Sequence, residues 1–319
     1  MKNLSFWRQT VAIGLAVLFG LTGLTGCSDN NYAVAPAAST TVTGTVAGGA
    51  ALVGAAVTAT GANGAVMIKY QFPNNLTINS GAGAVTFSGT VGNVGAVGNL
   101  SLASTTGTTT INTTLVATTG AQSYSNPVTV SQAATLRGSS VTTSSTMGAS
   151  ANALTITTDA ISIGGALSGT SSLVIQPLTA STTIGLNTGT GSLSLDATEI
   201  SRLSGFSSVT IGSTNGTGTI NVAGSTNIGN STILRADSAA ICITGAMNIT
   251  GSLNVSTTGT TTISGGTVIT TGTQNYTGPV ALGAATTLNG TTVHTQSTVA
   301  GGAYDLTIAG NANIAGVIS

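Results

Sequence analysis

Short alternations of apolar and polar residues dominate the chain beyond residue 75. In each of them an apolar, a small polar and a second apolar residue follow one another, which is the period of two expected for a strand with one buried face. Gly, Asn and Ser separate these runs, and no long helical period appears beyond residue 40. The pattern therefore predicts an all-β protein of many short strands. The clearest alternations are residues 76–78, 85–87, 100–102, 154–156, 161–163, 193–195, 209–211, 241–243, 253–255 and 306–308.

The chain also contains a long internal repeat. Residues 105–111 recur as residues 257–263, and the match continues without a gap to residues 154–156 and 306–308. Roughly half of the paired positions are identical, which indicates an architecture that grows by stacking one unit on the next. Stacked short strands form a parallel β-helix, in which we expect Val, Ile and Leu to point inward and Thr, Ser and Asn to point outward.

The composition agrees with many small strands and excludes some partners. Charged residues make up 4% and aromatic residues 3% of the chain, and there are 45 glycines. Thr and Val favour strands because their branched side chains suit a pleated surface, whereas Gly supplies turns. Beyond residue 26 there are four Lys and Arg against six Asp and Glu, a net charge of −2. Without a basic patch, the chain is not expected to bind nucleic acid.

The N-terminus has the layout of an export signal. Lys2 and Arg8 precede an apolar run over residues 11–24, which is shorter than the roughly 20 residues of a membrane-spanning helix. The run ends in Leu24, Thr25, Gly26 and Cys27, and this ending resembles the lipobox of bacterial lipoproteins.

The lipobox resemblance implies that residues 1–26 are removed and that Cys27 carries lipid, which anchors the protein to a membrane. In such lipoproteins an Asp after the Cys favours retention at the inner membrane. Ser28 stands there instead, so the resemblance implies the outer membrane. Residues 27–40 are polar and small and are expected to form a flexible tether. Residues 41–75 are expected to form an N-terminal β segment or cap, and residues 76–319 the repetitive solenoid.

One segment departs from the strand pattern. Residues 196–204 predict a short helix with Asp196 as its N-cap, Glu199 as the capping-box partner and Gly205 at its end.

The repeats themselves resemble those of very large bacterial surface proteins, the filamentous-haemagglutinin-like β-helix adhesins. The resemblance rests on residues 118–124 and 270–280, on residues 205–212 with 216–218, and on residues 181–186, and it covers roughly residues 75–319. It implies a right-handed parallel β-helix outside the cell, with a role in adhesion, cell contact or biofilms. Those proteins carry a secretion domain after a plain signal peptide, whereas a lipobox stands here.

Candidate chemistry is sparse. His294 is the single histidine and is paired in the repeat with Thr142, so a surface role is expected. Cys242 stands between Ile241 and Ile243, which predicts that it points away from them or fills a small slot at a bulge. The carboxylates are spread along the sequence, whereas polysaccharide-cleaving enzymes need a clustered pair. No catalytic residue, metal site or cofactor is therefore predicted, and the chain is not expected to be an enzyme.

The sequence predicts a lipid-anchored structural or adhesive protein that binds through a distributed surface rich in Thr, Ser and Asn. Its partners would be the membrane through lipid on Cys27, and glycans, matrix or other copies of itself. The expected location is the outer membrane, at the cell surface or facing the periplasm. Alternatives are a periplasmic structural lipoprotein, a carbohydrate-active β-helix and an ice-binding protein. The ice-binding alternative rests on residues 108–110 and 260–262, two runs of three threonines.

Overall fold

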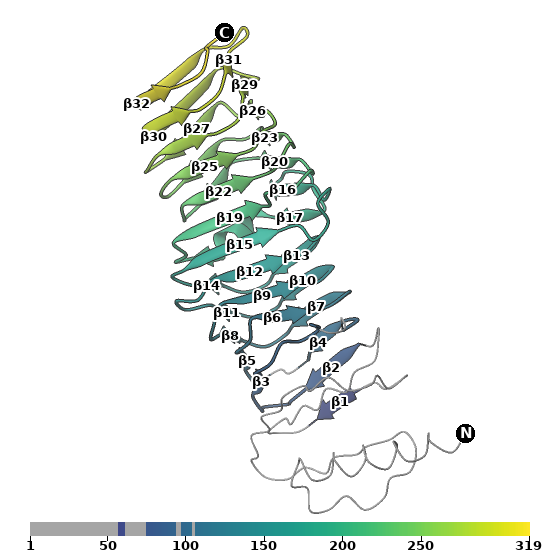
Figure 1. Ribbon diagram of the computed structural model, residues 1–319. Helices are drawn as coiled ribbons and strands as arrows, with labels where there is room; N and C mark the ends of the chain where they lie inside the picture. Colours follow the sequence, from purple (N-terminus) through teal and green to yellow (C-terminus); the bar gives the residue numbers. More distant parts are fainter. Residues whose placement is uncertain (1–56, 61–74, 94–96, 104–105) are drawn as a thin grey trace, which may run out of the picture. The chain divides into compact units, whose positions relative to one another are not determined.

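The chain winds into a parallel β-solenoid of about 12 turns, as the computed structural model in Figure 1 shows. It describes residues 57–60, 75–93, 97–103 and 106–319, which belong to one compact unit. The predicted all-β solenoid is confirmed, with about 50% strand and 2% helix. The expected signal peptide, the tether and most of the N-terminal segment lie outside the described residues.

From residue 100 to residue 176, each coil contributes one strand to each of three parallel sheets. The first sheet contains β1 (Val57–Thr60), β2 (Leu76–Asn79), β4 (Leu100–Leu102), β7 (Ala121–Tyr124), β10 (Ser140–Thr143) and β13 (Ala160–Ile163). The second contains β3 (Val85–Phe87), β5 (Thr109–Ile111), β8 (Val128–Val130), β11 (Met147–Gly148), β14 (Leu167–Ser168) and β18 (Leu203–Ser204).

The third sheet runs on into the second half of the solenoid. It contains β6 (Leu115–Ala117), β9 (Ala134–Arg137), β12 (Leu154–Thr157), β15 (Ser172–Gln176), β19 (Ser208–Gly212), β22 (Thr232–Arg235), β25 (Leu253–Ser256) and β28 (Gln274–Tyr276). The long strand β30 (Thr286–Thr295) pairs with β28 and also with the end of a second row of strands. The two rows are therefore joined into one sheet through β30. The second row contains β27 (Thr267–Thr270), β24 (Met247–Ile249) and β21 (Thr226–Ile228), and β32 (Leu306–Ile314) pairs with β30.

A fourth sheet completes the second half. It contains β17 (Leu193–Leu195), β16 (Ile184–Asn187), β20 (Ile220–Ala223), β23 (Ile241–Ile243), β26 (Thr261–Ile263), β29 (Val280–Leu282) and β31 (Val299–Ala300).

Apolar side chains at alternate strand positions fill the interior. All ten alternations found in the sequence lie within strands. In the third sheet, Leu154, Leu173 and Val209 lie above one another in register, and each is fully buried. Burying a side chain of this size contributes about 1.5–3 kcal/mol. A thin core of many Val, Leu and Ile residues therefore replaces the aromatic anchors that the composition lacks.

Threonine is not only an outward residue, which corrects the expectation from the sequence. Fourteen threonines are buried among the described residues. Several of them lie beside corners, where the hydroxyl donates to a backbone carbonyl two residues away. Examples are Thr118 to Gly120 at 2.8 Å, Thr158 to Ala160 at 2.8 Å and Thr270 to Gly272 at 2.8 Å. The hydroxyl thus donates to a corner carbonyl and is itself satisfied inside the core; the Gly120 and Gly272 carbonyls also accept from Ser139 and Thr291 of the next coil.

A buried glutamine and tyrosine form the same network in both copies of the repeat. The Gln122 amide donates to the carbonyls of Val116 (2.9 Å) and Arg137 (2.8 Å) and accepts from the Tyr124 hydroxyl (2.8 Å). In the second copy, Gln274 donates to two carbonyls at 2.9 and 2.8 Å and accepts from Tyr276 at 2.9 Å. Burial raises the pKa of both tyrosines. The identities in the repeat therefore preserve a completely satisfied polar group in the core.

The two copies lie on different sides of the solenoid. Tyr124 lies on β7, in the first sheet. Tyr276 lies on β28, in the third sheet, whose ladder begins at β6, the strand before β7 along the chain. The repeat therefore advances by a number of coils that is not whole, and equivalent residues point in different directions.

One long coil interrupts the regular spacing. Successive partners in the third sheet are usually about 20 residues apart, as with Leu154 and Leu173, but Leu173 pairs with Val209, 36 residues on. Within this coil the order of two strands is inverted. β17 follows β16 in the sequence, yet β16 lies between β17 and β20 in the sheet.

Glycines permit this inversion. The connection from β16 to the parallel strand β17 spans residues 188–192, whereas such crossovers usually need a dozen residues or more. A Cβ atom on Gly185 would lie 2.1 Å from the Gly189 carbonyl oxygen. One on Gly189 would lie 2.1 Å from the Asn221 oxygen, and one on Gly191 would lie 2.3 Å from the Gly185 nitrogen. The backbone segments thus approach more closely than any other residue allows.

The predicted helix is present in the same coil as α2 (Ala197–Ser201). The Asp196 side chain accepts from the Glu199 amide at 2.7 Å, and the Glu199 carboxylate accepts from the Asp196 amide at 3.1 Å, which completes the capping box. The expected end at Gly205 is wrong. Arg202 is the C-cap, and Gly205, with φ of 77°, follows β18. The helix ends early because the chain must rejoin the second sheet at Leu203.

Gly189→Ala is expected to destabilise the protein by about 1–3 kcal/mol, since the added methyl group overlaps backbone atoms. Gly229→Ala is the matched control, because a Cβ atom there has nothing within 4 Å. Urea unfolding of both variants measures the difference. Equal stability of Gly189→Ala and wild type would contradict the close crossover.

Thr109 and Thr261 are equivalent in the repeat but differ in their partners. The Thr109 hydroxyl bonds to Asn126 Oδ1 at 3.0 Å, whereas Gly278 replaces this asparagine in the second copy and the buried Thr261 hydroxyl has no partner. Removing an unsatisfied hydroxyl costs nothing in hydrogen bonding, whereas removing a satisfied one orphans its partner.

We therefore expect Thr261→Val to stabilise the protein by about 1 kcal/mol and Thr109→Val to destabilise it by about 1–3 kcal/mol. Thermal unfolding of the two single variants compares them directly. If both variants shifted the melting temperature in the same direction, the absence of the asparagine from the second copy would have no effect on stability.

Candidate functional site

Uncharged hydroxyl groups line the outside of the first sheet. At its central outward position, the strands β2, β4, β7, β10 and β13 carry Thr77, Ser101, Ser123, Thr142 and Ser162, which are in register with one another. All five are half-buried or exposed. Neighbouring strands of a sheet lie about 4.8 Å apart, so the hydroxyls form a closely spaced row without charge.

The outside of the second sheet begins in the same way. Thr86, Thr110 and Thr129 follow one another in register on β3, β5 and β8, and Gly148 then interrupts the threonines. Of the two triple-threonine runs, the middle residues Thr109 and Thr261 point into the core. In the second copy Thr262 lies between Cys242 and Ala281, so no threonine row continues there. The triple-threonine motif therefore does not produce matching rows in the two copies.

On the C-terminal part of the third sheet, outward side chains are amides rather than hydroxyls. Asn275 Nδ2 donates to Asn254 Oδ1 at 2.9 Å, and Gln296 Nε2 donates to Asn275 Oδ1 at 3.0 Å. On the row that leads to β30, Asn248 Nδ2 donates to Asn227 Oδ1 at 2.9 Å. These chains of amides hold the outward side chains in place and keep the surface polar without charge.

The predicted lipobox residues Leu24, Thr25, Gly26 and Cys27 lie outside the described residues. Lipidation of Cys27 therefore stays a prediction.

The histidine and the second cysteine are not brought together. His294 is half-buried and lies in register between Asn275 and Asn313. Cys242 is a free, half-exposed thiol on β23, between the buried Ile241 and Ile243, so it points outward as the alternation predicted. Because β23 and β30 belong to different sheets, the structure gives no Cys–His pair.

Two carboxylates that are far apart in the sequence, Asp159 and Glu199, lie on consecutive coils. Asp159 accepts hydrogen bonds from the Thr179 amide (2.8 Å), the Thr179 hydroxyl (2.6 Å) and the Thr182 hydroxyl (2.7 Å). Glu199 accepts from the Asp196 amide and from the Ile163 amide, the latter at 2.8 Å. Their oxygens therefore bond to the chain itself, which is an architectural use of the carboxylate. Sequence reasoning predicted the contact between Glu199 and Asp196 but missed the others, because their partners lie 20 to 36 residues away.

Among the residues that the structure describes, no group of three or more His, Cys, Asp or Glu side chains could hold a metal ion. In the same part of the chain, no helix has both the length and the apolar character needed to span a membrane. What the described surface offers chemically is a set of rows of hydroxyl and amide groups.

The hydrogen bonds of Asp159 have a consequence for acid stability. Partial burial raises the pKa of this carboxyl, but the bonds from Thr179 and Thr182 outweigh burial and hold the pKa below its usual range. A depressed folded pKa stabilises the fold fully above the unfolded value of about 3.9 and ceases to do so as pH falls through the folded pKa.

Asp159→Asn is therefore expected to lower the melting temperature most at neutral pH, with the difference from wild type shrinking below about pH 4. Asp237→Asn is the control, since its exposed side chain makes no hydrogen bond within the described residues. Melting curves of the three proteins from neutral pH into acid measure this. A difference that does not depend on pH would mean that the Asp159 charge plays no part.

Comparison with known proteins adds no relative. No family model matches the chain, and neither a curated protein nor a solved structure matches it. The function is therefore argued from the residues described above.

Proposed function

We propose that the protein is a lipid-anchored structural or adhesive element of a bacterial cell surface. The observation that carries the proposal is the row of outward Thr and Ser side chains on the first sheet, which continues over five strands without a charged residue. A surface of this kind makes many weak and similar contacts, each worth little alone. Contact with glycans, matrix or other copies of the chain is the use that suits it.

The charged side chains support the same proposal. Asp159 and Glu199 bond to backbone or hydroxyl groups of neighbouring coils, and Arg202 donates to the Ile163 carbonyl. Acid and base chemistry needs a carboxyl that is free to exchange a proton with a substrate. Groups that hold the fold together are poorly suited to that work, so an adhesive or structural role is the better proposal.

The N-terminus supplies the anchoring half of the proposal. Lys2 and Arg8, the apolar run and Cys27 make up a lipoprotein signal, and the following Ser28 favours the outer membrane. Residues 27–40 would hold the solenoid away from the lipid surface. Display outside the cell then makes the hydroxyl rows available to partners.

Protease treatment of intact cells tests the proposal. We expect a C-terminal tag on the wild-type chain to be removed from whole cells, because the solenoid is displayed outside. In Cys27→Ala the protein should no longer fractionate with the membrane, since the acylated residue is missing. Immunoblots of cells and fractions measure both results.

Retention of the same cells on a glycan-coated surface tests adhesion separately. Thr142→Ala should change retention little, whereas Ser123→Asp combined with Thr142→Asp should reduce it, because two charges interrupt the row. A tag that is protected until the outer membrane is breached would overturn surface display and favour a periplasmic structural role. Displayed protein with no effect of the double variant would overturn adhesion through the first sheet.

A further inference from the structure

Two of the three ladders stop at one coil of the solenoid, the first below it and the second above it. The first sheet ends at β13, which pairs only with β10, although β17 lies in contact with it. The second sheet ends at β18, which pairs only with β14, and β21 pairs only with β24. Within residues 106–319, only the third sheet continues through this level, from β15 to β19. The coil that contains β16, β17 and α2 is called the junction coil below.

Charged side chains replace the missing backbone bonds. The Ile163 amide on β13 donates to the Glu199 carboxylate at 2.8 Å, and the Ile163 carbonyl accepts from the Arg202 guanidinium. Both partners extend from the C-terminal part of α2. Beside them, Asp159 binds Thr179 and Thr182, where the chain enters the junction coil. Three of the few charged residues of the chain are thus used at a single level.

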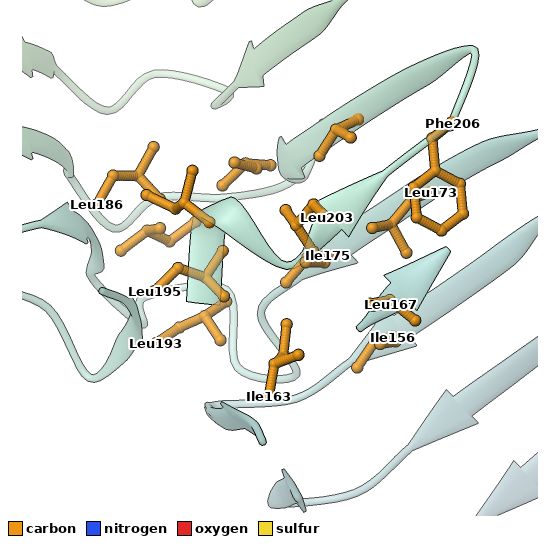
Figure 2. Packing of buried hydrophobic residues seen from close by; sticks show 14 of the residues in the cluster. Ile156, Ile163, Leu167, Leu173, Ile175, Leu186, Leu193, Leu195, Leu203 and Phe206 are labelled. Carbon is orange, nitrogen blue, oxygen red and sulfur yellow. The ribbon is translucent and has the colours of Figure 1, made fainter. Parts of the chain in front are cut away.

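The apolar core passes through the junction coil without a break. Figure 2 shows Ile163 and Leu167 from below the junction facing Leu193, Leu195 and Leu203 of the junction coil. All five are buried to within 4% exposure. The two halves therefore remain in apolar contact through the junction coil. What this coil lacks is one ladder on each side, from β13 below it and to β21 above it, rather than packing.

Stability in a solenoid is close to a sum over coils and the interfaces between them, so the chain opens first where an interface is weakest. We propose that the junction coil divides the solenoid into two blocks, residues 76–176 and residues 208–319, which open separately, with Asp159, Glu199 and Arg202 as the clamp that joins them. Under load along its axis the solenoid yields at this coil, while the ladders on either side stay intact. The inference is independent of the adhesive role.

Hydrogen exchange of the purified protein in low denaturant, followed by mass spectrometry, tests the proposal. Peptides over residues 160–169 and 184–205 should exchange about tenfold faster than peptides from β9 to β12 and from β22 to β25, as expected for a local opening. Equal exchange in all these peptides, with one cooperative transition on unfolding, would overturn the proposal.

Variants identify the clamp. Glu199→Ala and Arg202→Ala should each speed exchange at residues 160–169 by about a further tenfold, the effect of losing a hydrogen bond to a charged group, and leave β22 to β25 unchanged. Asp196→Ala is the matched control, because it removes the helix cap but leaves both bonds to Ile163. If Asp196→Ala has the same effect, or if exchange rises in every coil, the clamp is refuted.

Discussion

Backbone hydrogen bonds between one coil and the next are the interaction on which the structure depends. In a parallel ladder each strand must find its partner one whole turn away, so neighbouring coils must be in register along several strands at once. Inward side chains then stack on their own kind, as Leu154 does on Leu173 and Val209. This lets a chain with 3% aromatic residues build a continuous core.

The same constraint explains where the polar groups lie. Buried polar side chains find hydrogen-bond partners in the backbone at the corners. Threonine hydroxyls donate to carbonyls two residues away, and the Gln122 and Gln274 amides each donate to two carbonyls. Where the first sheet ends at β13, longer charged side chains are used, and Glu199 and Arg202 reach the backbone of Ile163. Asp159, Glu199 and Arg202 thus serve the architecture, and the outside of the first sheet carries a row of hydroxyls.

This distribution also shapes the proposed function. A catalytic site brings chemically different side chains together at one place, whereas this solenoid repeats chemically similar side chains along its sides. The rotation of the second copy onto another side means that equivalent rows do not form one continuous face. Binding would therefore use several shorter surfaces, each with its own residues, such as the hydroxyl row of the first sheet and the amide chain through Asn275.

The sequence by itself determined the strands, the repeat and the short helix, because each depends on residues close together in the chain. Alternation with a period of two sets which residues of a strand face inward, and Asp196 and Glu199 cap a helix three residues apart. The outward position of Cys242 followed from its neighbours in the same way.

Only the tertiary structure decided how the coils stack. A single 36-residue step between Leu173 and Val209 interrupts two ladders and brings Asp159 and Glu199 to consecutive coils. The length of each coil and the backbone contacts of Gly185 and Gly189 set this arrangement. Partners about 20 to 36 residues apart leave no local period in the sequence, so neither the clamp nor the buried threonines could be predicted from it.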